Sequence, residues 1–202
     1  MPVEIEVDTK SLKRVAVELG EVSKKDVPKA VVSALNRAVD SAATATKREA
    51  KQAYEIKEKD LMRKDKRGQP PIRKQKATLS NMQAGVFVVG RPKGLFNFKV
   101  KKSKGKKKYI SVKIKKGSGY QKLPRKAFIL NIPDKNGTAV SNVFVRTTDN
   151  RYPLKRLATL SVPQMVSTPA ALSNIQKTAQ ETLEKRTAHE IERRLSKVKG
   201  DK

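Results

Sequence analysis

The chain has 202 residues, enough for one domain with a modest core, and it carries 47 Lys and Arg against 19 Asp and Glu. A net charge of +28 is typical of proteins whose partners are nucleic acid, anionic lipid or acidic protein surfaces. With no cysteine and one histidine, disulfide frameworks, thiolate metal sites and Cys/His catalysis are excluded. No apolar run approaches the roughly 20 residues of a membrane span.

The first part of the chain predicts a strand and two helices. Apolar and acidic residues alternate from Val3 to Asp8, which is the pattern of a short strand, and a short helix is expected in the remainder of residues 1–26. The longest helix is predicted over residues 27–56, where nothing breaks the helical pattern. Its apolar face is rich in small residues that let another element approach closely. This face comprises Ala30, Val31, Ala34, Leu35, Ala38, Ala42, Ala45 and Tyr54.

The middle of the chain predicts an antiparallel sheet. Residues 57–76 are strongly basic and predict a short helical turn followed by a loop. Apolar residues then recur with a period of two, which predicts about five strands within residues 72–148. Asn136-Gly137 is the strongest hairpin signal between these strands.

The last part of the chain predicts a connector and a helix. Residues 149–168 contain two prolines without clear periodicity, which predicts an extended connector. Apolar residues at helical spacing predict a final helix over 169–198, with Ser167 or Thr168 as its N-cap. The whole pattern predicts one α+β domain over residues 1–198, with the long N-terminal helix packed on the sheet and a long C-terminal helix.

A lysine-rich hairpin over residues 99–116 is the sharpest local feature, because it holds ten lysines and no acidic residue. In an alternating strand the lysines at 99, 101, 113 and 115 point away from the apolar side chains, so that one face packs and the other presents charge. The hairpin is predicted to contact DNA phosphates or an acidic partner surface. The alternative is a solvated edge whose lysines prevent edge-to-edge pairing. The ten lysines are Lys99, Lys101, Lys102, Lys104, Lys106, Lys107, Lys108, Lys113, Lys115 and Lys116.

No other pattern indicates chemistry at a defined site. The few aromatic residues form no base-stacking platform, so any nucleic-acid contact is expected to involve backbone phosphates without sequence preference. His189 stands alone in the last helix, and no phosphate-binding glycine motif occurs. The chain is therefore predicted to have no catalytic residues, no metal site and no cofactor. A nuclease is the enzyme alternative, and the lack of clustered acidic residues argues against it.

Several motifs follow one another in the order of a known family. They are Ala34-Leu35-Asn36-Arg37-Ala38, Lys126-Ala127-Phe128-Ile129, Val143-Phe144-Val145-Arg146, Arg151-Tyr152-Pro153-Leu154 and Ser161-Val162-Pro163-Gln164-Met165. In this order they resemble the minor tail protein Z family, the tail completion proteins of long-tailed bacteriophages and prophages. The resemblance covers roughly residues 27–195.

The resemblance implies a structural protein of the virion, located in the neck region of the tail and assembled in the host cytoplasm. Such relatives have an α+β fold with a curled antiparallel sheet on a long helix. They form a homo-oligomeric ring, usually a hexamer, between the tail tube or tail terminator protein and the head-side connector or adaptor protein. Nonspecific contact with genomic DNA is expected, and membrane contact is not. The alternative is a free nucleic-acid-binding protein that uses the lysine-rich hairpin.

The family motifs and the connector supply candidates for the subunit interface. Arg37 and Arg48 are either solvated helix charges or members of ion pairs, within one subunit or between subunits. The proline-stiffened segment 151–165 is either packed on its own sheet or docked on a neighbour. The predicted interface residues are Asn36, Arg37, Arg48, Arg146, Arg151, Tyr152, Leu157 and Met165.

Overall fold

The computed structural model describes residues 3–6, 26–65, 67–103, 109–133 and 139–200. The chain divides into two compact units, which are treated separately below. The first comprises residues 1–49, 64–89 and 166–202, and the second comprises residues 50–63 and 90–165. The single domain predicted over 1–198 stays a prediction. The short helix predicted within residues 1–26 lies outside the described residues.

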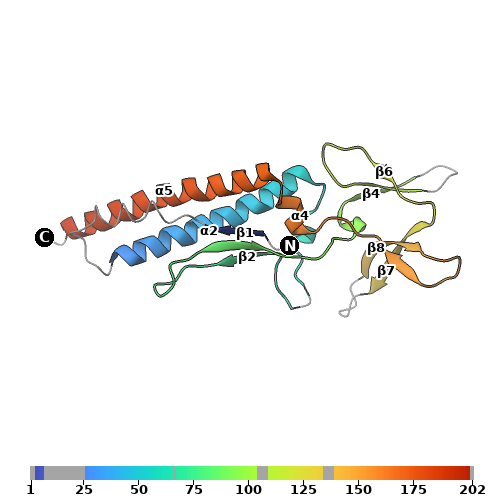
Figure 1. Ribbon diagram of the computed structural model, residues 1–202, viewed down its shortest axis with the longest axis horizontal. Helices are drawn as coiled ribbons and strands as arrows, with labels where there is room; N and C mark the ends of the chain where they lie inside the picture. Colours follow the sequence, from blue (N-terminus) through green and yellow to red (C-terminus); the bar gives the residue numbers. More distant parts are fainter. Residues whose placement is uncertain (1–2, 7–25, 66, 104–108, 134–138, 201–202) are drawn as a thin grey trace. The chain divides into compact units, whose positions relative to one another are not determined.

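Two long helices dominate the first unit and lie side by side in opposite directions (Figure 1). They are α2 (Asp26–Ala53), of which the last four residues belong to the second unit, and α5 (Pro169–Gly200). Both were predicted from their periodicity, and both predictions are confirmed. Thr168 is the N-cap of α5, because its Oγ1 accepts a hydrogen bond from the backbone N–H of Ala171 at 3.4 Å. No helix in the described part of the chain has the length and apolar character needed to cross a membrane.

Three polar contacts connect α2 with α5 at regular intervals. Ser33 Oγ donates to Glu190 Oε1 at 3.1 Å, and Thr182 Oγ1 donates to Ser41 Oγ at 2.9 Å. Asn174 Nδ2 donates to Glu49 Oε1 at 3.4 Å. Each step of eight residues forward along α2 is matched by a step of eight residues back along α5. The contacts therefore define one antiparallel register for the helix pair.

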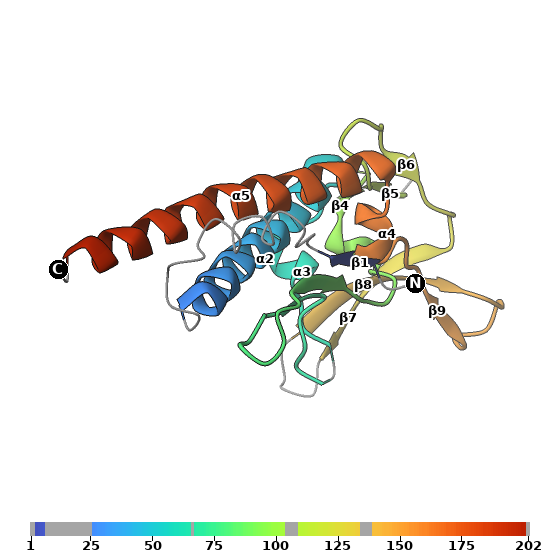
Figure 2. The same cartoon turned by 60° about the vertical axis from the view of Figure 1, so that its left-hand side comes forward.

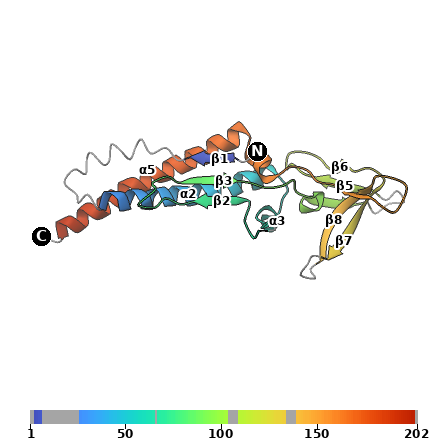
Figure 3. The ribbon, with the colours of Figure 1, turned by 60° about the horizontal axis from the view of Figure 1, so that its bottom comes forward.

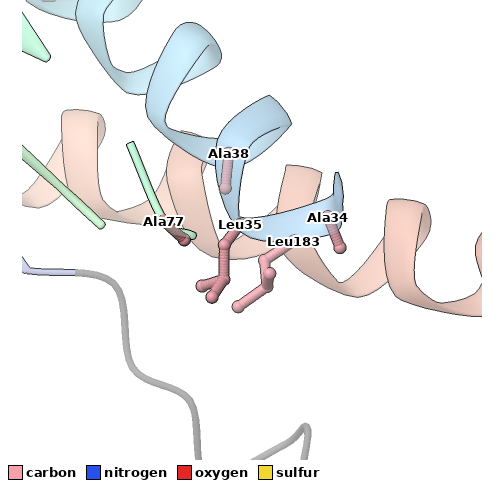
Figure 4. Close-up of a cluster of buried hydrophobic side chains, with 5 residues drawn as sticks. All are labelled: Ala34, Leu35, Ala38, Ala77 and Leu183. Carbon is pink, nitrogen blue, oxygen red and sulfur yellow. The ribbon is translucent and has the colours of Figure 1, made fainter. Parts of the chain in front are cut away.

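The apolar core between these helices is built from alanines around two leucines. Leu183 of α5 is fully buried against Ala34, Leu35 and Ala38 of α2, and Ala77 completes the cluster (Figure 4). Alanine on α2 removes side-chain bulk, so that the helix backbones approach closely. The small-residue face predicted for α2 is thus confirmed as a core face.

A three-stranded antiparallel sheet completes the first unit, with strand order β1-β3-β2. Its strands are β1 (Val3–Glu6), β2 (Ile72–Gln75) and β3 (Gly85–Val88). The predicted N-terminal strand is confirmed, and it pairs along the whole length of β3. The predicted loop after the helical turn is wrong in part, because β2 lies within it. Only the first residue of β2, Ile72, is fully buried, so the strand lacks the alternating pattern that reveals a strand.

The second unit contains two more three-stranded antiparallel sheets, with orders β4-β5-β6 and β7-β8-β9. The prediction of a single curled sheet of about five strands is therefore wrong, because the strands form three separate sheets and none of them is curled. Figure 3 labels β5, β6, β7 and β8 of this unit. The strands of this unit are β4 (Lys99–Lys102), β5 (Ile110–Lys113), β6 (Gln121–Lys122), β7 (Ala127–Pro133), β8 (Ala139–Arg146) and β9 (Leu154–Arg156). The short helical elements are α3 (Glu58–Leu61), η1 (Leu95–Asn97) and α4 (Val162–Val166).

The segment 149–168 is structured and is not only an extended connector. It contains β9, which pairs with β8, and the helix α4. Ser161 is the N-cap of α4, and Gln164 Oε1 accepts hydrogen bonds from both the backbone N–H and the Oγ of Ser161 at 2.8 and 2.9 Å. This is the backward bond of a capping box, in which the side chain of the third helical residue accepts a hydrogen bond from the N–H of the cap. The prediction of an extended segment overlooked this Ser-x-x-Gln signal.

Candidate nucleic-acid interface

The lysine-rich hairpin forms the sheet β4-β5-β6 with the predicted division into two faces. Lys99 lies opposite Lys113, and Lys101 lies opposite Ser111. Residues directly opposite each other in an antiparallel pair share a face, so these residues lie on one side of the sheet. Val112 on the other side is 1% exposed, whereas Lys99 and Lys101 are exposed. The predicted alternation is confirmed for Lys99, Lys101 and Val112, but Ser111 on the charged side is only 8% exposed, so β5 itself is covered on both sides.

The sequence reasoning missed Lys122, which β6 adds to the same face. Lys122 lies opposite Ser111 and is exposed. Its Nζ lies 5.0 Å from the centre of the Tyr109 ring, and Lys101 Nζ lies 4.5 Å from the centre of the Tyr120 ring. Both distances are in the range of cation–π attraction, which holds an ammonium group over a ring while leaving it accessible to anions. The Gly117-Ser118-Gly119 turn before β6 was the available signal for a further paired strand.

The charge on this face is partly balanced at one end. Lys113 Nζ lies 3.3 Å from Glu55 Oε1, and both side chains are only about a fifth exposed (23% and 22%). The backbone places Glu55 there, because its N–H donates to the carbonyl of Ile114 at 2.8 Å. The pair relieves the repulsion between Lys113 and the opposing Lys99. Of these lysines, Lys99, Lys101 and Lys122 are the exposed ones. We call these three residues the lysine face.

The remaining lysines of the hairpin have different positions. Lys104, Lys106, Lys107 and Lys108 lie outside the described residues. Lys102 lies opposite Ile110 and belongs to the other side of the sheet, although it is exposed. Lys115 and Lys116 are exposed just beyond β5, where Lys115 is bridged to Tyr54.

Another basic residue of this unit points inward. Lys93 Nζ donates to the backbone carbonyls of Asp60 at 2.7 Å and Leu61 at 3.4 Å, at the end of α3. Burial lowers the pKa of Lys93, although the nearby Asp60 opposes this effect. Lys93 therefore closes a helix end and adds no charge to the exposed face.

Three predicted interface residues make contacts within their own unit. The side-chain amide of Asn36 donates to the carbonyl of Ala77 at 3.1 Å and accepts from its N–H at 2.8 Å. Leu157 is half-buried, and its backbone bonds to Val143 and Leu95. Met165 is 1% exposed within its own chain, and its role at a subunit interface stays a prediction.

The other predicted interface residues are exposed. Arg37 and Arg48 lie on the outer side of α2. The guanidinium carbon of Arg146 lies 5.5 Å from the centre of the Phe128 ring. Tyr152 is 64% exposed, and the guanidinium carbon of Arg151 lies 5.8 Å from the centre of its ring. A role of these four arginines and of Tyr152 at a subunit interface stays a prediction.

The described residues bring together no group of His, Asp or Glu that could hold a metal ion. His189 is exposed on α5, far along the sequence from the lysine face. The fold and this surface together define a class of protein, namely an α+β protein with a basic surface.

The comparison with protein families narrows this class. Residues 9–199 match the family model described as prophage minor tail protein Z (GPZ), so the chain belongs to this family of phage tail structural proteins. The resemblance read from the motifs is thereby confirmed. Proteins of this family are structural and not enzymes, which makes the nuclease alternative wrong and places the protein in the virion tail. Neither the curated proteins nor the solved structures contain a match.

Proposed function

We propose that the protein completes the phage tail by forming a ring at its head-proximal end, where it enables head-tail joining and DNA passage. The ring lies in the neck and is a homo-oligomer, with a hexamer as the expected state. On one side it contacts the tail terminator or tail tube protein. On the other side it contacts the head-side connector or adaptor protein.

The observation that carries this proposal is the lysine face of the β4-β5-β6 sheet in a tail structural protein. Lys99, Lys101 and Lys122 are exposed on one side of this sheet. A subunit of net charge +28 repels its own copies unless negative charge is near, and the genome inside a tail supplies that charge. Lysine is a compact point charge that contacts phosphates without reading bases, which suits a channel through which every sequence must pass.

The alternative function is that of a free, nonspecific nucleic-acid-binding protein, which the same face also supports. Complementation separates the two. Tails produced without this protein are mixed with purified protein, then with filled heads, and infectious particles are counted. We expect the protein to bind tail ends in the presence or absence of DNA and to restore joining. A protein that binds DNA tightly as a monomer and leaves tail ends bare would refute the proposal.

The lysine face is tested by a charge-matched pair of variants. One replaces Lys99, Lys101 and Lys122 by Gln. The control replaces Lys59, Lys177 and Lys185, which are exposed away from the lysine face, by Gln. Both variants therefore have the same net charge.

Each phosphate contact contributes about 0.9 to the slope of log affinity against log salt on duplex DNA, so the first variant should lose a slope of about 2.7. The control should keep the wild-type slope. If both variants retain DNA binding but only the first fails to complete tails, the face binds an acidic protein surface. Equal behaviour of both variants in both assays would leave edge protection as the role of these lysines.

A further inference from the structure

We propose that the outer part of the β7-β8 hairpin is the surface through which one copy of the chain binds a second copy. This outer part consists of residues 130–133 of β7 and 140–141 of β8, and we call it the hairpin arm. The inference rests on the ring proposed above, and it names the element that joins neighbouring subunits.

Apolar side chains are exposed along the hairpin arm. Leu130 is 36% exposed and Ile132 is 43% exposed, and their alternation along β7 places both on one face. The base of the hairpin is different, because Val143 is 0% exposed and β9 begins to pair only at Phe144. The arm thus extends beyond the part of its sheet that has three strands. Figure 2 shows β7, β8 and β9 of this sheet.

The edge of β7 has little of the usual protection against pairing, because its only such residue is the proline at its end. Among the described strands, β7 pairs with β8 alone, so one of its edges is open. Natural edge strands carry lysines, prolines or bulges that prevent pairing with another chain. Strand β4 of the same protein follows this rule with three lysines in four residues. Strand β7 reads AFILNIP, without any charge and with proline only at its end.

The absence of charge indicates which partner the arm fits. Charged residues make up 33% of the chain, yet neither β7 nor β8 has one before Arg146. Lys126, just before β7, is paired with Asp149 at 2.7 Å. DNA and acidic proteins bind through attraction to positive charge, and the strands of the hairpin arm offer them none. A second copy with its own +28 charge can approach closely only where positive charge is missing, so the arm suits a second copy of this chain.

Sedimentation equilibrium of the purified full chain at 0.15 M and 1 M NaCl is the first test. High salt screens the repulsion between copies and leaves an apolar contact intact, so we expect association to increase with salt. The arm variant replaces Leu130 and Ile132 by Thr, which keeps strand propensity. Its matched control replaces Leu79 and Met82 by Thr, because these side chains are exposed to a similar degree elsewhere (58% and 38%).

The arm variant should weaken self-association about tenfold or more, and the control should leave it unchanged. If the double variant does not unfold cooperatively, the single variant Ile132→Thr takes its place in the sedimentation experiment, because Ile132 is the more exposed of the two residues. Wild-type protein that stays monomeric at 1 M NaCl and about 100 μM, or association that both variants retain equally, would overturn the inference.

The second test identifies the occupant in assembled tails. The chain has no cysteine, so Asn131→Cys provides one attachment point for a benzophenone crosslinker at an exposed position of the arm. Leu79→Cys is the control. We expect a product of twice the chain mass from the arm position only.

The two proposals fail in different ways. Tails that contain the labelled protein but give crosslinks only to another tail protein would overturn the self-contact and leave tail completion standing. Protein that never attaches to tails would refute tail completion, and the sedimentation experiment would then decide the self-contact by itself.

Discussion

Replacing Asn36 by Ala tests whether this family-motif residue holds the subunit together or contacts a neighbour. The Asn36 amide forms two hydrogen bonds with the backbone of Ala77, which is 4% exposed and belongs to the core cluster. Without the amide, a buried N–H and a buried carbonyl lose their partners, at about 1–3 kcal/mol each. Alanine returns about 0.5 kcal/mol of helix propensity. We therefore expect a net loss of about 1.5–5.5 kcal/mol in the free energy of unfolding.

Urea denaturation followed by far-ultraviolet circular dichroism measures this loss. The control is Arg37→Ala, one position further along α2 and exposed, which should change stability by less than about 0.5 kcal/mol. Equal midpoints for the two variants would refute the reasoning. If Asn36→Ala were as stable as wild type and still failed to complete tails, its predicted role at a subunit interface would be supported instead.

Three further changes test the helix pair and its charges. Leu183→Ala should lower the free energy of unfolding by about 2–5 kcal/mol, measured by urea denaturation, because it opens a cavity beside α2. A smaller loss than that caused by Leu79→Ala, at an exposed leucine, would contradict the packing. Thr168→Ala should cost about 0.5–1 kcal/mol, because the N–H of Ala171 loses its cap at the start of α5, and unchanged stability would argue against the cap. The hydrogen bond from Lys74 lowers the pKa of Asp40 below its ordinary 3.8. The ionised Asp40 therefore contributes to the free energy of unfolding above pH 3.8, and this contribution is lost as the pH falls through the lowered pKa. Asp40→Asn should therefore flatten the acid limb of a plot of melting temperature against pH, and an unaltered limb would rule this out.

The sequence was most informative where local periodicity decides the structure. The helices α2 and α5 follow directly from apolar residues at helical spacing. The division of the lysine-rich hairpin into two faces follows from strict alternation in β4 and β5. In both cases the pattern is contained within a few consecutive residues, so no knowledge of distant partners is needed.

The sheets could not be assembled from the same patterns, because strand pairing depends on residues far apart in the chain. β1 pairs with β3 about eighty residues later, and alternation alone does not encode this choice of partner. β2 has one buried residue followed by Arg73-Lys74-Gln75, a composition that also fits a loop. Pairing at a distance and short polar edge strands therefore account for the single sheet that was predicted in place of three.

Candidate site residues were harder to predict, because side-chain exposure depends on tertiary packing. Met165 and Leu157 have the apolar character of an interface, yet Met165 is buried and Leu157 is half-buried. Lys122 was missed because β6 has only two residues and is defined by its partner β5. A sequence shows that a segment is apolar or basic, whereas only the fold shows whether its own chain already covers it.

The polar contacts between α2 and α5 have a consequence for how the helix pair responds to force. The alanine face of α2 is nearly uniform along its length, so its apolar contacts alone do little to fix the position of α5 along the helix axis. Ser33, Ser41 and Glu49 fix this position, since they are about 12 Å apart along the helix and each has its partner at only one offset. A shift by one turn would separate all three contacts at once. The pair therefore resists shear along its axis, the direction in which a smooth alanine seam is weakest.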